Sequence, residues 1–164
     1  MKPWIWLRVL AILLVIFAVG HTLGTAAPKV TRGPQEAAVF AAMQEFRFPI
    51  MGFERTYWDF FRGFALIISV LFVLMAAIAW QVGTLSKQSR QLALPMAITL
   101  LIGCVGLFIL SWIFFFGAPI VNSALCVVCS TVAVALLAKD RPGNVSYADS
   151  DRTHPSEGVG HPVR

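Results

Sequence analysis

Cys126 and Cys129 are the residues whose types and spacing come closest to a redox motif, in the string Cys-Val-Val-Cys. Two cysteines at this spacing share one region of a helix surface and can form a redox pair when one thiol is activated. Cys126, however, lies about two turns into its expected helix, beyond the reach of the helix N-terminus, and apolar surroundings disfavour a thiolate. Packing of two small residues inside a membrane helix is therefore the simpler interpretation.

A third cysteine, Cys104, is expected at nearly the same depth on the neighbouring helix, which would bring three thiols together. No histidine or carboxylate shares that depth, so we expect no metal site there. We also expect no haem, because His21 is the only histidine within an apolar run and a second axial ligand is missing. A quinone is expected as a cofactor only if Cys126 and Cys129 form a redox centre.

A second group, of charged and aromatic side chains, lies between Gly52 and Gly63, where a polar segment is followed by a long apolar run. Charged residues alternate there with aromatic ones, which suits a membrane–water boundary. The charged residues are Glu54, Arg55, Asp59 and Arg62, and the aromatic ones are Phe53, Tyr57, Trp58, Phe60 and Phe61.

The composition of the whole chain indicates that lipid is its solvent. Of its 164 residues, 58% are hydrophobic and 13% are charged, and the mean hydropathy is +0.77. A soluble domain carries about 25% charged residues, so this chain has too little polar surface to cover itself in water. The net charge of +5 does not indicate nucleic-acid binding, because the basic residues are scattered and mostly flank apolar runs.

The apolar runs predict an all-α protein, a four-helix transmembrane bundle, in a single domain over residues 1–138. A span of about 20 residues crosses a hydrocarbon core of about 30 Å. The run 92–138 is too long for one crossing and must fold back at Gly117-Ala118-Pro119. The expected spans are 4–23, 57–80, 92–116 and 119–138, with a short basic loop at 84–91 and a disordered polar tail at 139–164.

The first span has an alternative interpretation as a cleaved signal peptide, with a cleavage site at Thr25-Ala26-Ala27. The proline that follows this site favours a retained span. Between the first two spans, Pro34 is expected to begin a short helix. Val39, Met43 and Phe46 would give this helix one apolar face, so we expect a short amphipathic helix on the membrane surface.

Polar side chains of all four spans are expected in one outer layer when depth is counted at about 1.5 Å per residue. Asp59 and Arg62 are three positions apart and can pair, and His21 can hydrogen-bond to that pair. The inner halves are almost wholly apolar, with Ser69 and Thr99 as exceptions. The candidates for ligand binding are His21, Arg55, Trp58, Asp59, Arg62, Trp112 and Asn122.

This layer has two interpretations: a pocket for a lipid headgroup, a quinone or another amphiphile, or a polar network that fixes helix register. No phosphate loop, nucleophile–histidine–acid set or paired carboxylates supports hydrolase or transferase chemistry. We therefore expect no catalytic residues outside the cysteine pair.

Four spans put both termini on one side of the membrane, together with the purely basic loop at 84–91. Short basic loops face the cytoplasm, so we expect cytoplasmic termini.

The strings GHTLGT at 20–25, AAMQEFRFP at 41–49, MGFERTYWDFFRGF at 51–64 and SW at 111–112 resemble a family of small bacterial four-span integral membrane proteins. The resemblance implies the same architecture and a bacterial inner membrane, and it carries no established activity.

The Cys-Val-Val-Cys pair in a fourth span is similar to that of the vitamin K epoxide reductase family, where such a pair lies beside a bound quinone. That family relays electrons through a further cysteine pair in the loop after the first span. Residues 25–56 contain no cysteine, so the likeness covers only the pair and the helix count.

Three functional hypotheses follow. The first is a non-catalytic membrane protein with an outer-leaflet pocket for a lipid or another apolar ligand. The second is a thiol–quinone oxidoreductase that uses Cys126 and Cys129. The third is a structural or assembly subunit that packs against a membrane-protein partner or a second copy of itself.

Overall fold

The computed structural model describes residues 2–27 and 30–139, and it confirms the all-α fold class. The elements in order are α1 (Pro3–Ala26), α2 (Pro34–Glu45), β1 (Arg47–Ile50), β2 (Phe53–Thr56), α3 (Tyr57–Gln88), α4 (Arg90–Phe114) and α5 (Gly117–Lys139). Helices α1, α3, α4 and α5 are each long and apolar enough to cross a membrane, as in a multi-pass membrane protein. The expected tail lies outside the described residues, except for Lys139.

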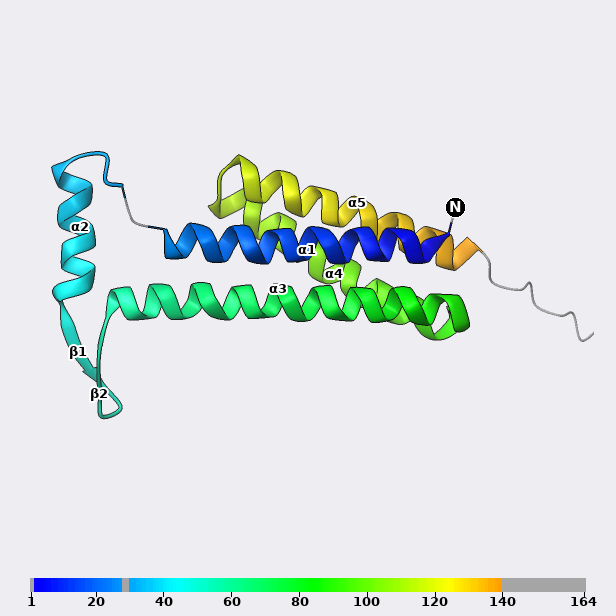
Figure 1. Ribbon diagram of the computed structural model, residues 1–164, viewed down its shortest axis with the longest axis horizontal. Coiled ribbons are helices and arrows are strands. Elements are labelled where there is room, and N and C mark those ends of the chain that lie inside the picture. Colours follow the sequence, from blue (N-terminus) through cyan, green and yellow to red (C-terminus); the bar gives the residue numbers. More distant parts are fainter. Residues whose placement is uncertain (1, 28–29, 140–164) are drawn as a thin grey trace, which may run out of the picture.

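The four long helices form an antiparallel bundle, in which α1 packs against α3 and α5, and α4 packs against α5 and α3 (Figure 1). The start of α1, the α3–α4 connection and the end of α5 lie at one end, here called the basic end. Its described basic residues are Lys2, Arg8, Lys87, Arg90 and Lys139. The opposite end carries α2 and the two strands and is called the loop end. There the α4–α5 turn stops short of the ends of α1 and α3.

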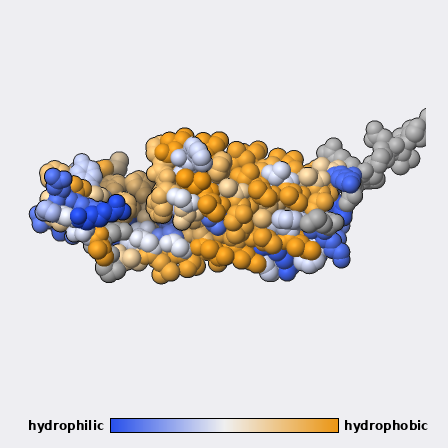
Figure 2. All heavy atoms as spheres, turned by 90° about the horizontal axis from the view of Figure 1, so that it is seen from above, coloured by the Kyte–Doolittle hydropathy of each residue, from blue (hydrophilic) through white to orange (hydrophobic). Residues whose placement is uncertain are grey.

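On the face of the bundle shown in Figure 2, apolar side chains cover most of the surface between two polar ends. Large side chains such as Ile16, Val70 and Ile102 are more than half exposed. Water would penalise such a surface, whereas lipid tails solvate it. The exposed belt therefore supports the membrane environment that the composition predicts.

Small residues line the interior of the bundle and let the helices approach closely. Ala76, Ala79, Ala97 and Ala133 are buried in the core. Gly83 on α3 lies against α1, where an added Cβ would be 3.4 Å from the Leu7 Cβ. Membrane helices pack through such small residues, because lipid tails provide no hydrophobic force to press the helices together.

The α3–α4 connection differs from the expected loop at 84–91. Helix α3 continues to Gln88, α4 begins at Arg90, and Ser89 alone separates them. The Ser89 hydroxyl accepts a hydrogen bond from the Leu92 N–H at 3.4 Å and caps α4. Leucine, lysine and glutamine favour the helix and no proline interrupts it, so polarity alone did not end α3.

The segment between α1 and α3 contains a hairpin that the sequence analysis does not predict. Strand β1 pairs antiparallel with β2, from Arg47 opposite Thr56 to Ile50 opposite Phe53. The two turn residues, Met51 and Gly52, have φ angles of 53° and 85°. Positive φ at both positions is typical of the tight hairpin turn that matches strand twist.

Aromatic contacts attach α2 and the hairpin to the start of α3. The ring centroid of Phe48 lies 4.9 Å from Tyr57, and that of Phe40 lies 5.9 Å from Trp58. Helix α2 is present as expected, and its half-buried side includes Phe40 and Met43. Val39, expected on the apolar face, is 59% exposed, so the packed face is rotated from the one that the spacing predicts.

Candidate functional site

His21, Thr22 and Ser69 form a polar cluster between α1 and α3 near the loop end. The Nδ1 atom of His21 is 3.1 Å from Ser69 Oγ, and the Thr22 hydroxyl is 2.8 Å from the same oxygen. Ser69 is buried because it lies on the side of α3 that faces α1, in register with Ala65 and Phe72. The cluster therefore joins α1 and α3 through residues that are 47 positions apart along the chain.

Each hydroxyl of the cluster has a choice of acceptor. Thr22 also lies 2.8 Å from the Ala18 carbonyl oxygen, and Ser69 lies 3.2 Å from the Ala65 carbonyl oxygen. Since each hydroxyl has one proton, Ser69 donates either to His21 Nδ1 or to the Ala65 carbonyl oxygen, and the tautomer of His21 decides between them. In both tautomers the second ring nitrogen, Nε2, has no partner within the described chain and is not buried. It can therefore contact a bound molecule.

An open apolar groove of about 470 Å³ runs along the α1–α3 seam beside this cluster. The Thr22 and Ser69 side chains are the only polar ones among the described residues that line it. The lining residues are Ala18, Val19, Thr22, Leu23, Leu66, Ser69, Val70 and Val73. An apolar wall with a few fixed polar groups is the usual make-up of a site for an apolar ligand.

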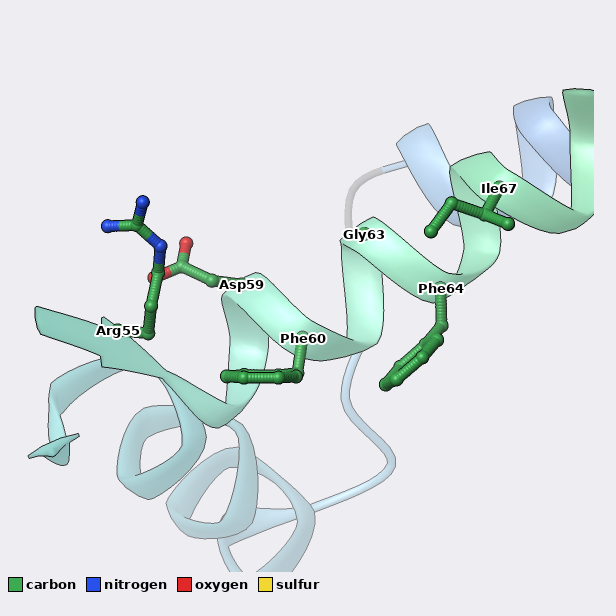
Figure 3. Close-up of a pocket in the computed structure, with 6 residues that line it drawn as sticks. All are labelled: Arg55, Asp59, Phe60, Gly63, Phe64 and Ile67. Carbon is green, nitrogen blue, oxygen red and sulfur yellow. The ribbon is translucent and has the colours of Figure 1, made fainter. Parts of the chain in front are cut away.

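A second hollow, of about 260 Å³, lies at the start of α3 (Figure 3). Arg55 and Asp59 project to one side of it, and Phe60 and Phe64 lie along the helix beside Gly63. The Arg55 guanidinium lies over the Phe53 ring at 5.2 Å and donates to the Glu54 carbonyl oxygen at 2.8 Å. This hollow is about as open as the groove but smaller, and its charged side chains are exposed.

Asp59 does not form the expected pair with Arg62; within residues 2–27 and 30–139 its carboxylate makes no ion pair. The Thr56 N–H donates to Asp59 Oδ2 at 3.0 Å, and the Asp59 N–H donates to Thr56 Oγ1 at 3.1 Å. This reciprocal arrangement is a capping box, which satisfies donors at the helix start. His21 hydrogen-bonds Ser69 and not an Asp59–Arg62 pair, so that part of the prediction is wrong.

The other three candidates occupy separate places. Trp58 packs between Phe40 and Phe61 and ties α2 to α3. Trp112 is 68% exposed on the outside of α4. The Asn122 amide donates to the Leu13 carbonyl oxygen at 3.4 Å, between α5 and α1.

Leu13 precedes His21 by eight residues, which places Asn122 about 12 Å deeper than His21. The seven candidates therefore do not line one pocket. His21 alone among them belongs to the cluster beside the groove.

Ser69 is expected in the inner half of its span, whereas in the structure it lies level with His21. The expected depth assumes that Tyr57 lies at the membrane boundary. Helix α3 has 32 residues and is about 48 Å long, so it exceeds a hydrocarbon core of about 30 Å. At the loop end α3 begins beyond the end of α1 (Figure 1). Ser69 therefore lies level with His21, although it is well inside α3.

The three cysteines meet in the core between α4 and α5. Cys104 and Cys126 are fully buried, Cys129 is 5% exposed, and all three are free thiols. Cys104 faces Ser130 and Cys126 across the helix pair. Within the described part of the chain, no three histidine, cysteine or acidic residues are arranged to hold a metal ion. The geometry is that of a packed thiol cluster without an opening to the surface at Cys104 or Cys126.

Comparison of the chain with protein-family models, with curated proteins and with solved structures finds no match. The family resemblance read from the sequence therefore stays a prediction.

Proposed function

We propose that this protein is a non-catalytic integral membrane protein that binds a membrane lipid in the groove between α1 and α3. The observation that carries the proposal is the pair of hydroxyls, Thr22 and Ser69, at the wall of an otherwise apolar groove. The groove opens on the lipid side of the bundle, so an acyl chain can lie along Val19 and Val70 while an ester group contacts the hydroxyls. His21 Nε2 supplies a further polar contact at the same level.

The proposal includes a location and a family. The basic end carries five of the described basic residues, and basic ends of membrane bundles face the cytoplasm. We therefore assign both termini to the cytoplasmic side of a bacterial inner membrane. We also assign the chain to the family of small bacterial four-span membrane proteins whose strings it resembles at 20–25 and 51–64.

The experiment that tests lipid binding is photo-crosslinking with a bifunctional phospholipid, followed by mass-spectrometric mapping of labelled peptides. We expect labels on Val19, Leu23, Leu66 and Val70. The double variant Thr22→Val, Ser69→Ala should reduce labelling, whereas Thr99→Val should not. Thr99 is a matched control because its hydroxyl bonds only to the Pro95 carbonyl oxygen of its own helix. Even labelling of all apolar faces, unchanged in the double variant, would show ordinary lipid solvation and refute the site.

The thiol–quinone alternative rests on one observation, the meeting of Cys104, Cys126 and Cys129. It is less supported, because a quinone would have to reach thiols that are buried in the helix core. The assembly-subunit alternative rests on the exposed apolar belt, which lipid alone is sufficient to cover.

A further inference from the structure

Arg8 lies inside the first span, between two indole rings. Its guanidinium carbon is 4.0 Å from the ring centroid of Trp80 on α3 and 5.6 Å from that of Trp4 on α1. The ammonium of Lys87 is 4.2 Å from the same Trp4 ring. Two cations from neighbouring helices thus contact one tryptophan at the basic end.

Among the described residues, Arg8 has one buried nitrogen that no protein acceptor satisfies. Its Nε is buried and has no hydrogen-bond partner. Within the described ranges, 2–27 and 30–139, its contacts are with the two rings, and it forms no ion pair. A buried donor without an acceptor is destabilising, so a polar group that enters the space beside Arg8 would stabilise this arrangement.

No acidic residue at the basic end can supply that acceptor, as far as the described chain extends. The acidic residues of the described chain, Glu36, Glu45, Glu54 and Asp59, all lie at the loop end. Arg8 and Lys87 therefore have no described counter-charge nearby. Two cations in this arrangement favour the binding of an anion.

A glycine on α3 lets this helix approach α1 closely beside Arg8. Gly83 lies opposite Trp4 and Leu7, where an added Cβ would be 3.5 Å from the Trp4 carbonyl oxygen and 3.7 Å from Arg8 Cγ. This close approach brings Trp80 and Lys87, one turn to either side of Gly83, onto α1. A longer side chain at position 83 would separate them.

We propose that Arg8 and Lys87 bind the phosphate group of an anionic phospholipid at the basic end of the α1–α3 seam. A guanidinium donates two parallel hydrogen bonds to a phosphate, and an ammonium adds a point charge. The ring faces of Trp4 and Trp80 contact the cations. Tryptophans are enriched at the membrane–water interface, where the lipid headgroups lie. This site lies at the opposite end of the bundle from the groove, so its test does not depend on lipid binding in the groove.

The test uses the full chain in nonionic detergent, titrated with phosphatidylglycerol and observed by native mass spectrometry. We expect saturable binding of phosphatidylglycerol and weaker binding of phosphatidylcholine. Arg8→Gln should weaken phosphatidylglycerol binding by about tenfold or more, because it removes hydrogen bonds to a charged group. Lys87→Gln should weaken it too, and since Lys87 is exposed this variant keeps the test valid if Arg8→Gln does not fold.

The matched control is Lys139→Gln, which removes the same charge from the same end but from α5. Its effect should be about threefold at most, because an exposed charge acts through screened electrostatics. A loss equal to that of Arg8→Gln would mean diffuse attraction and would overturn the site. Inorganic phosphate distinguishes the source of the anion: competition at concentrations similar to the lipid's would identify a free-phosphate site and refute the lipid.

Discussion

Ser69 Oγ on α3 lies 3.1 Å from His21 Nδ1 on α1, so one hydroxyl provides the polar link between the two helices that form the groove. Thr22 shares that oxygen. The arrangement accounts for both interpretations of the polar layer: it fixes the register of α1 on α3, and it presents polar atoms to the surface.

Replacing Ser69 tests the register role. Ser69→Ala removes the partner of both His21 and Thr22 and should cost about 1 kcal/mol of unfolding free energy, since hydrogen bonds between membrane helices average about 0.6 kcal/mol. Unfolding in mixed micelles measures this change. In a double-mutant cycle, His21→Ala should couple to Ser69→Ala. A zero coupling energy would mean that the two side chains do not interact.

The capping box at the start of α3 predicts unequal effects of neighbouring substitutions. Thr56→Ala should cost about 1 kcal/mol of stability through lost capping, and Asp59→Ala should destabilise the same turn. Arg62→Gln should leave the melting temperature and the amide exchange of residues 57–60 unchanged, because Arg62 has no part in the cap. If Arg62→Gln loosened this turn as much as Asp59→Ala, an Asp59–Arg62 pair would have to exist.

Burial predicts that the thiols are unreactive. In the folded protein, N-ethylmaleimide should not label Cys104 or Cys126 and should label Cys129 slowly, whereas unfolding should expose all three. Mass spectrometry of the intact chain counts the adducts. The double variant Cys126→Ser, Cys129→Ser should bind the photo-lipid normally. A Cys126–Cys129 disulfide that responds to quinone supply would instead support the redox alternative.

Gly83 predicts a steric limit on the α1–α3 contact. Gly83→Leu should cost about 1–3 kcal/mol because it overfills a close-packed position, and it should also weaken phosphatidylglycerol binding by moving Lys87 away from Arg8. The matched control is Gly106→Leu on α4, where an added Cβ meets no atom within 4 Å. That change should be neutral or stabilising, since glycine is a poor helix former. Equal losses in both variants would contradict the role of Gly83.

Most of the fold follows from the sequence because membrane spans are read from long apolar runs, and four such runs are plain in this chain. The helix ends follow less well. Polar residues such as Lys87 and Gln88 suggested a loop, yet they are good helix formers and continue α3 past the apolar run. The hairpin is not predicted because Gly52 is its only strong sequence signal.

The candidate site was predicted only in part, because depth along a helix says nothing about which way a side chain faces. His21 is among the predicted site residues, whereas Ser69 is predicted to lie deeper, in the inner half of its span, because counting from Tyr57 assumes that α3 begins at the membrane boundary. Trp112 and Asn122 were assigned to the right end of their helices, and one faces outward while the other reaches α1. The facing of a residue depends on how the helices are rotated in the bundle, and spacing within one helix does not give that rotation.

The single-residue connection at Ser89 has a consequence for how the chain is made. Helix α4 begins as soon as α3 ends, so no length of chain is available to leave one helix behind while the other inserts. The two helices form a helical hairpin with Lys87 and Arg90 at its tip, and we expect the pair to enter the bilayer together. The hairpin can cross the membrane in only two orientations, and a wrong orientation would invert both helices together.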